Sequence, residues 1–298
     1  MSLSLSEFST ETYGKWILAG EHAVLRGSAA LAFPLRSRSL QLSFTPRQDS
    51  FDVEFSGEHG ADLKLLFFGV LENAMARLHI TSPLQGHFNL DSTLPVGTGL
   101  GASAALCGAV ARWCCAQGFV QEAEIYEFAR GLEDLFHGES SGVDLAVSLS
   151  AQGVRFVRGQ KPQPLECAWS PRLYLSYSGQ RGMTSECVAK VKQLFLTDKS
   201  KAEKLDLQMR DAVDLADQAL RKSESVGFES LKVALELAGG CFEEWGLCHG
   251  DLALHIRQLR EAGAVAAKPT GSGGGGYVLS LWDAEPPLSL QPLLIPAF

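Results

Sequence analysis

The stretch PVGTGLGASAA, residues 95–105, decides how this chain folds and what it can hold. Its glycines Gly97, Gly99 and Gly101 let the backbone come close to a ligand, because no Cβ stands in the way. An apolar helical pattern follows directly, over residues 103–117. The stretch therefore predicts a loop whose backbone N–H groups, together with a helix N-terminus, face an anion such as phosphate.

Other loop types share part of this pattern. No Lys-Ser or Lys-Thr follows Gly101, so the loop is not a Walker A loop. Residues 97–102 do satisfy the loose dinucleotide pattern, which leaves a dinucleotide-dependent oxidoreductase as an alternative. That fold expects an acidic residue about 20 positions on, at the end of a strand, but Glu122 and Glu124 stand in a polar stretch. A tight turn capped by Ser103 before a buried helix is the structural alternative.

Composition excludes several classes of protein. A length of 298 residues suits one large domain or two moderate ones. The net charge is −8 and basic residues form no run, so we expect no nucleic-acid partner. Residues 1–10 lack the features of a signal peptide, and the longest apolar stretch is broken by Arg112, so we expect no membrane partner. Seven cysteines without a CxxC pair indicate free thiols and a cytoplasmic location.

Helical and alternating patterns follow one another without regular βα alternation, which predicts an α+β fold. Strands are expected at residues 16–19, 40–44, 51–55, 86–92, 154–157, 173–177, 265–268 and 277–282. Helices are expected at residues 63–78, 103–117, 121–136, 185–195, 201–222, 230–245 and 251–262. A Pro-rich link near residues 161–171 predicts two domains, residues 1–165 and 166–298. We assign no structure to residues 285–298.

Three further segments accompany the loop: GKWILAGEHAVLRG (residues 14–27), EDLFHGESSGVD (residues 133–144) and KPTGSGGGG (residues 268–276). In this order and at these distances, the four segments resemble the GHMP kinase superfamily, and within it the mevalonate kinases. The resemblance implies an N-terminal domain like ribosomal protein S5 domain 2 and a ferredoxin-like C-terminal domain, with the site between them. It also implies that the glycine run of residues 271–276 packs against the phosphate loop.

The resemblance implies an ATP-dependent phosphorylation of the primary hydroxyl of mevalonate, with ATP and Mg²⁺ as cofactors and mevalonate as the small-molecule partner. It assigns ATP binding to Pro95, Gly97, Gly99, Leu100, Gly101, Ala102 and Ser103. It assigns Mg²⁺ to the Ser103 hydroxyl and the Glu133 carboxylate, and such oxygen ligands are the ones that Mg²⁺ prefers. The alternative for Glu133 is a solvent-exposed helix residue in an acidic run.

By the same resemblance Asp144 is the catalytic base and Lys15 its cationic neighbour. A lysine near Asp144 would favour the ionised carboxylate and offset charge on the moving phosphoryl group. The alternatives are a capping role for Asp144 and a surface position for Lys15. His137 is expected to have a structural role in this segment.

For the acceptor, the resemblance assigns Glu21, His22, Gly142, Thr184, Gly273 and Gly274 to substrate binding. Each has a plainer alternative. His22 could be a histidine satisfied within a loop, Thr184 a helix N-cap, and the glycine run a flexible linker.

Two other functions stay open. Phosphomevalonate kinases usually carry a tyrosine where this chain has His22, a difference of one residue, so phosphomevalonate kinase or another GHMP small-molecule kinase is the alternative. A non-catalytic binding protein of this fold has no need for a base and a metal carboxylate together. The chain departs from the family at one position of the phosphate loop, because Ala102 replaces a serine found in many mevalonate kinases. The sequence does not determine the oligomeric state, and a homodimer is possible.

Overall fold

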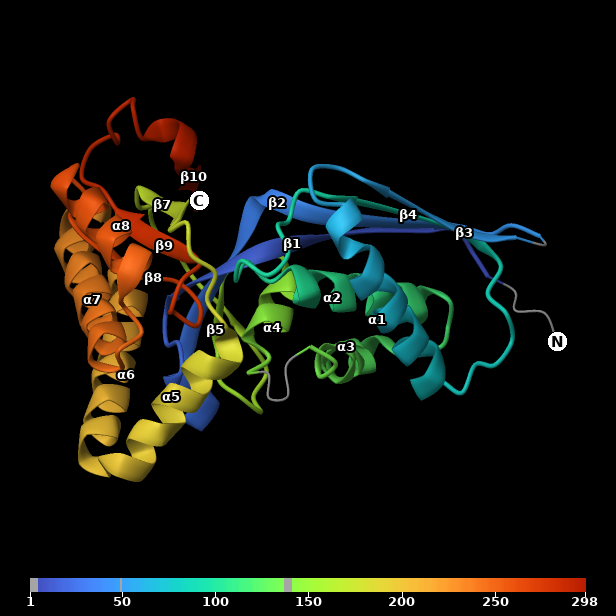
Figure 1. The fold of residues 1–298 in the computed structure, drawn as a ribbon, viewed down its shortest axis with the longest axis horizontal. Helices are drawn as coiled ribbons and strands as arrows, with labels where there is room; N and C mark the ends of the chain where they lie inside the picture. The colour runs from blue at the N-terminus through green and yellow to red at the C-terminus, as the bar shows by residue number, and fades with distance from the viewer. Residues whose placement is uncertain (1–4, 49, 137–140) are drawn as a thin grey trace. The chain divides into compact units, whose positions relative to one another are not determined.

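The computed structural model describes residues 5–48, 50–136 and 141–298, so His137 lies outside the described residues (Figure 1). The chain forms two compact units, each built from two separate stretches. Unit 1 comprises Met1–Lys15 and Arg38–Ala151, and unit 2 comprises Trp16–Ser37 and Gln152–Phe298. The domain division at residues 165 and 166 stays a prediction, because a compact unit and a domain need not coincide.

Two paired strands contribute residues to both units. They are β1 (Phe8–Ala19) and β2 (Ala30–Thr45). Only residues 16–19 of the first and 40–44 of the second were expected as strands. Residues 30–35 of β2 are apolar and buried on both faces, so they show no alternation. Residues 8–15 of β1 are mostly polar, so they give no clear strand pattern either.

Unit 1 is a sheet covered by helices. Its strand β4 (Gly86–Ser92) pairs antiparallel with β2 and parallel with β3 (Phe51–Ser56), so β4 lies between two strands that precede it in sequence. The helices are α1 (Lys64–Arg77), α2 (Ala102–Ala116), α3 (Ile125–Glu133) and α4 (Val143–Ser150), with short 3₁₀ turns η2 (Ala61–Leu63) and η3 (Glu122–Glu124). In Figure 1, α1 and α2 lie against one face of these strands.

Helix α2 is the centre of this unit. It packs against α1, α3 and α4, and most of its residues are buried. Every second residue of β4 is buried, and the Phe88 ring from that strand lies 5.1 Å from Trp113 of α2 and 4.7 Å from Phe44 of β2. This aromatic contact anchors the helix that begins at the phosphate loop.

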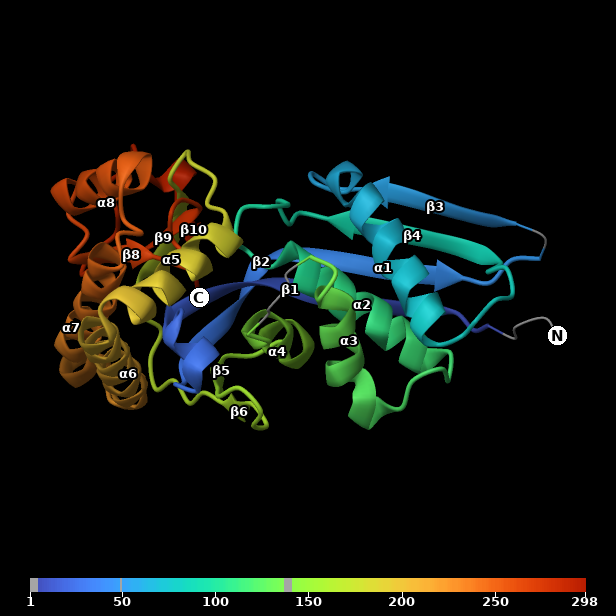
Figure 2. The same cartoon turned by 60° about the horizontal axis from the view of Figure 1, so that its bottom comes forward.

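Unit 2 contains an antiparallel sheet in the order β10 (Ile295–Pro296), β7 (Leu173–Tyr177), β9 (Tyr277–Leu281) and β8 (Ala266–Pro269). The first part of β2 pairs with β5 (Val154–Phe156), which pairs with β6 (Gln163–Pro164). The helices are α5 (Thr184–Thr197), α6 (Lys199–Arg221), α7 (Glu224–Glu244) and α8 (Gly250–Glu261), with 3₁₀ turns η1 (Ala23–Arg26) and η4 (Gln291–Leu293). Helices α6 and α7 lie side by side (Figure 2).

The α+β class is confirmed, and every helix and strand expected from the sequence is present. The largest difference in a helix boundary is in α7, which begins at residue 224 instead of 230. Helix α4, strands β6 and β10 and the 3₁₀ turns η1 and η4 were not expected. Strands β6 and β10 are only two residues long, and each depends on pairing with another strand. No helix in the described part of the chain is long and apolar enough to cross a membrane.

Candidate active site

The phosphate loop, residues 95–101, has the backbone that its glycines predict. Gly97, Gly99 and Gly101 have φ angles of 74°, 89° and 81°, in the left-handed region that favours glycine. A Cβ on Gly97 or Gly99 would meet no atom within 4 Å, whereas a Cβ on Gly101 would lie 2.9 Å from Cγ of Lys15. The first two glycines therefore border open space, and the third allows a lysine side chain to pack on the loop.

Helix α2 begins immediately after this loop. Its N-cap residue is Gly101, with no side-chain cap, so the alternative of a turn capped by Ser103 is wrong. The first turn directs backbone N–H groups toward the loop, an arrangement that attracts anions. Helices α3 and α4 follow α2 in the chain, and the next strand in the described residues, β5 (Val154–Phe156), pairs antiparallel with β2. The loop is therefore not part of a βαβ unit, and the dinucleotide alternative is wrong.

Lys15 and Asp144 form an ion pair beside the loop. Nζ of Lys15 lies 3.2 Å from Oδ1 of Asp144, and the side chains are 6% and 30% exposed. The backbone N–H of Lys15 donates to the Leu100 carbonyl at 2.9 Å, which ties β1 to the loop. Asp144 lies in the first turn of α4, where the helix N-terminus favours a negative charge. The alternative of a surface position for Lys15 is therefore wrong. Its ammonium group lies within ion-pair distance of the Asp144 carboxylate.

Glu133, the last residue of α3, is buried, so the alternative of a solvent-exposed residue is wrong. Burial, and then the negative charge of Glu133, raises the pKa of the Cys107 thiol. Cys107 lies four residues after Ser103 in α2, on the same helix face. The negative charge of Glu133 is therefore felt on the face of α2 that carries both Cys107 and Ser103.

Gly142 stands at the N-cap of α4 with a φ of 85°. Its carbonyl accepts a hydrogen bond from the Tyr126 hydroxyl of α3 at 3.2 Å. This contact ties the start of the Asp144 helix to the helix that carries Glu133. The two carboxylates are thereby held on packed, hydrogen-bonded elements.

A metal ion would find hard oxygen ligands here. Among residues 5–48, 50–136 and 141–298 there is no group of three or more His, Cys, Asp or Glu side chains that could hold a metal. One hydroxyl from Ser103 and one carboxylate from Glu133 nevertheless fit Mg²⁺, which is commonly held by one or two carboxylates, phosphate oxygens and water.

Unit 2 holds the residues expected to contact the acceptor. His22 is buried, and its Nε2 lies 2.9 Å from the Ser272 carbonyl oxygen. A carbonyl only accepts, so Nε2 carries the proton and Nδ1 is left as an acceptor. Burial lowers the pKa of His22 to about 4, so the ring is neutral at physiological pH. The rings of Phe242 and Trp245 pack edge-on against it. The plainer alternative for His22 is a ring whose hydrogen bonds are made within the protein. At Nε2 this alternative is met, because Ser272 accepts the hydrogen bond.

Glu21 pairs with a lysine that sequence reasoning missed. Its Oε1 lies 2.6 Å from Nζ of Lys268, and the side chains are 2% and 0% exposed. The only signal for Lys268 was a lysine within an apolar strand directly before the glycine run. One charged residue in this position does not indicate which side chain pairs with it, so the pairing with Glu21 could not be predicted.

The glycine-rich loop, residues 271–276, is held by several hydrogen bonds. Gln180 donates to the Gly274 carbonyl at 2.8 Å, and the Cys187 thiol donates to the Gly273 carbonyl at 3.3 Å. The Thr184 hydroxyl lies 3.3 Å from the Ser272 hydroxyl. These contacts exclude the flexible-linker alternative. Met183, not Thr184, occupies the N-cap position of α5.

The structure thus brings together two groups of predicted site residues. In unit 1 the phosphate loop, Lys15, Gly142 and Asp144 lie on connected elements, with Glu133 on the adjoining helix. In unit 2 His22 and Thr184 both contact Ser272 of the glycine-rich loop, and Glu21 is the neighbour of His22. Their roles, and the packing of this loop on the phosphate loop, stay predictions.

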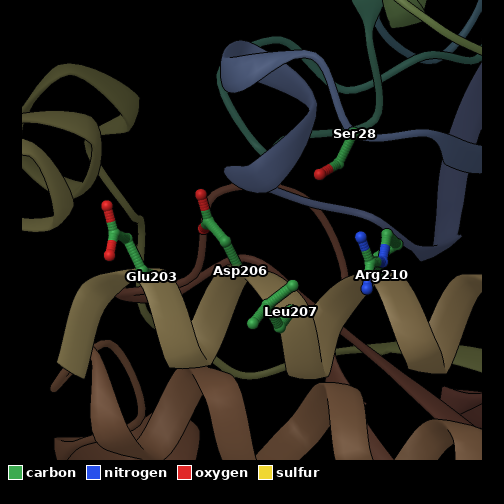
Figure 3. Close-up of a pocket in the computed structure, with 5 residues that line it drawn as sticks. All are labelled: Ser28, Glu203, Asp206, Leu207 and Arg210. Atoms are coloured by element: carbon green, nitrogen blue, oxygen red, sulfur yellow. The ribbon is translucent and has the colours of Figure 1, made fainter. Parts of the chain in front are cut away.

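One cavity of unit 2 contains none of the predicted site residues. It measures about 350 Å³ and is lined by Ser28, Glu203, Asp206, Leu207 and Arg210. Figure 3 shows Ser28 facing the four side chains of α6. Arg26, in η1, donates two hydrogen bonds of 2.5 Å to the Asp206 carboxylate. The pairing of Asp206 with Arg26 connects this cavity to the turn that begins at His22.

Known proteins resemble this chain in sequence and fold. The GHMP kinases N terminal domain family matches residues 66–152. A mevalonate kinase of Thermococcus gammatolerans is 28% identical over 295 residues, and one of Aeropyrum pernix is 29% identical over 287; each match covers 90% of this chain and 86% of the relative. The crystal structure of L. major mevalonate kinase in complex with R-mevalonate has a TM-score of 0.78 at 20% identity, over 95% of this chain and 90% of that one. The fold is that of GHMP kinases.

Proposed function

We propose that this chain is a member of the GHMP kinase superfamily that transfers the γ-phosphoryl group of ATP to the primary hydroxyl of mevalonate, because it matches the GHMP kinases N terminal domain family and is similar to mevalonate kinases. The products are 5-phosphomevalonate and ADP. The observation that carries the proposal is the 3.2 Å pair of Lys15 and Asp144 beside a glycine loop and a helix N-terminus.

Asp144 can act as the base. As the mevalonate hydroxyl oxygen forms its bond to the γ-phosphorus, the bond from that phosphorus to the bridging oxygen of ADP breaks, and the hydroxyl proton passes to the Asp144 carboxylate. The partial exposure of this carboxylate lets an alcohol reach it. The Lys15 ammonium group beside it offsets the charge that develops on the transferring group.

ATP would use the backbone of the phosphate loop. The open space beside Gly97 and Gly99 and the first turn of α2 suit the phosphates. Ser103 and Glu133 would hold Mg²⁺, and a bound Mg²⁺ would neutralise charge on the phosphate oxygens.

His22 would contact the acceptor through Nδ1. Because Nδ1 of the neutral ring only accepts, it suits a hydroxyl of mevalonate better than its carboxylate. Glu21, Gly142, Thr184, Gly273 and Gly274 stay predicted substrate contacts. A homodimer and a cytoplasmic location also stay predictions, the second supported by seven free thiols.

An ADP-release assay with Mg-ATP over a panel of alcohols tests the proposal. The panel contains mevalonate, phosphomevalonate, galactose and homoserine, and the Asp144→Asn variant serves as a blank. We expect mevalonate to give the highest kcat/KM. If phosphomevalonate is phosphorylated faster than mevalonate, the protein is a phosphomevalonate kinase instead. A folded protein that phosphorylates none of the four would be a binding protein of this fold or a kinase for another alcohol.

A further inference from the structure

The Lys268 side chain joins three segments of unit 2. Its ammonium group donates to the Glu21 carboxylate at 2.6 Å, to the Pro269 carbonyl at 2.7 Å and to the Ile17 carbonyl at 3.4 Å. Lys268 lies in β8, directly before the glycine-rich loop, while Ile17 lies in β1 and Glu21 follows that strand. One buried cation therefore holds the root of the loop against the segment that carries His22.

The backbone at His22 is strained. Its φ and ψ angles are 59° and −48°, and the Ala23 N–H donates to the Glu21 carbonyl at 2.6 Å, which closes a three-residue γ-turn. A γ-turn with a positive central φ is rare and strained for a residue with a Cβ. Such a backbone persists only where the surrounding structure holds it. Glu21, one end of this turn, is the residue that Lys268 holds.

The turn aims the His22 ring at the glycine-rich loop. Nε2 donates to the Ser272 carbonyl at 2.9 Å, and the rings of Phe242 and Trp245 pack against the imidazole. The charged groups that act on His22 through space are Arg26 and Asp206, with opposite signs. The His22–Ser272 hydrogen bond therefore links the turn to a loop that Gln180 and Cys187 also hold.

Stability alone gives no reason for a buried ion pair here. Replacing such a pair by apolar or neutral residues of similar volume is often neutral or stabilising, because two charges must lose their water. We infer that the Lys268–Glu21 ion pair is a positioning device. It holds the γ-turn at His22 and, through the His22–Ser272 hydrogen bond, places the His22 ring against Ser272 of the glycine-rich loop. Lys268 is then a positioning residue that has no need to touch substrate.

The kinetic consequence rests on the proposed function, so the experiment has an arm that needs no substrate. The double variant Glu21→Gln/Lys268→Met removes both charges of the pair, so neither is left buried without its partner. NMR of the His22 imidazole reports its environment directly. We expect the titration of His22, with a pKa of about 4 in the parent, to move up by at least about one pH unit, because the ring loses its buried place.

The second arm is kinetic. We expect kcat/KM for mevalonate to fall about tenfold or more in the double variant, with the KM for ATP within about twofold of the parent. Ser176→Ala is the matched control, because it removes another buried hydrogen bond to a histidine of unit 2, the 2.7 Å contact of Ser176 with His255. This control should leave the His22 titration unchanged.

The outcomes are distinct. A folded double variant with the parent's His22 titration overturns the inference, whatever the activity. A double variant that does not fold also overturns it, because the pair is then a stability element. A shifted His22 titration in a chain that phosphorylates no mevalonate supports the positioning role and counts against the proposed function alone. A shifted titration with unchanged kinetic constants overturns the link to the site.

Discussion

Two lysine–carboxylate pairs, one in each unit, differ in distance and burial. Lys15 and Asp144 lie 3.2 Å apart, and the aspartate side chain is 30% exposed. Lys268 and Glu21 lie 2.6 Å apart, and both side chains are almost completely buried. A carboxylate that meets solvent can take up a proton or change its partner at little cost. A buried one cannot, because every alternative leaves a charge without water or counter-ion.

The two pairs have the same chemistry, but their difference in burial suits them to different roles. The Lys15–Asp144 pair, called the exposed pair here because its carboxylate is partly exposed, suits a reaction in which the carboxylate must gain and lose a proton. The buried pair suits the holding of a backbone. Substitutions in the Lys15–Asp144 pair should therefore change activity with little change in stability, whereas loss of one member of the Lys268–Glu21 pair should also lower stability strongly.

Breaking the buried pair from one side should have the largest effect. Lys268→Met leaves the Glu21 carboxylate buried without its lysine, so the free energy of unfolding should fall by about 3–5 kcal/mol. Urea unfolding followed by circular dichroism measures this loss. Adding Glu21→Gln should restore most of it. A single variant as stable as the parent would contradict the burial of the pair.

His22 adds a pH dependence to the buried side of the comparison. Its pKa is about 4 in the folded chain and 6.5 as the ordinary value, so the unfolded chain binds more protons between these values. The contribution of neutral His22 is therefore complete above pH 6.5 and is lost as the pH falls toward 4, by about 3 kcal/mol in all. Urea unfolding of the parent and of His22→Gln at pH 7.5 and 4.5 isolates this share. Equal pH dependence in both proteins would sink the assignment.

Breaking the exposed pair should affect the rate. Asp144→Asn keeps the shape of the side chain but removes the base, so kcat should fall by about 100-fold or more. The free energy of unfolding should change by no more than about 1 kcal/mol, because the pair is partly solvated. Isothermal titration should still detect ATP. Near-normal turnover by the folded variant would remove Asp144 from the mechanism.

Gly101→Ala should disturb the exposed pair from the side of the loop. The new Cβ would lie 2.9 Å from Cγ of Lys15, at a φ of 81°. We expect a loss of stability of more than about 1 kcal/mol and a lower kcat, because Lys15 must move. Gly118→Ala is the control, since Gly118 has a φ of 77° with no atom within 4 Å of its Cβ. If both variants behave alike, backbone strain alone explains the effect.

The smallest effect concerns the metal. Glu133→Gln and Ser103→Ala should each raise the Mg²⁺ concentration for half-maximal rate by roughly three- to tenfold, because both are proposed to hold one ion. Rates over a Mg²⁺ series at saturating ATP measure this. A Glu133→Gln protein with the parent's Mg²⁺ dependence would leave Glu133 a buried structural residue.

Local patterns predicted most elements of the fold. The strand expected at residues 86–92 is β4 with the same bounds, and the helix expected at residues 103–117 is α2, one residue earlier. The pairing of the strands could not be predicted from local patterns. The consecutive strands β2 and β3 both pair with the later β4, and such choices depend on contacts distant in sequence.

The candidate site divides in the same way. The glycines of the phosphate loop predicted its backbone, because positive φ angles require them. The pairing of Glu21 with Lys268 joins residues 247 positions apart and has no local signature. The γ-turn at His22 also had no local signature, because such a strained backbone persists only where the surrounding structure holds it.

One contact in unit 2 has a consequence for biosynthesis. The buried indole N–H of Trp16 donates to the Ala297 carbonyl at 3.1 Å, and its ring stacks on Phe33 and meets Phe298 edge-on. These partners are 281 positions apart, so a ribosome that adds about 5–20 residues per second delivers the second one on the order of tens of seconds after the first. Unit 1 can close once Ala151 has emerged. Trp16 therefore completes its packing only at the end of synthesis, after the residues of unit 1 have been made.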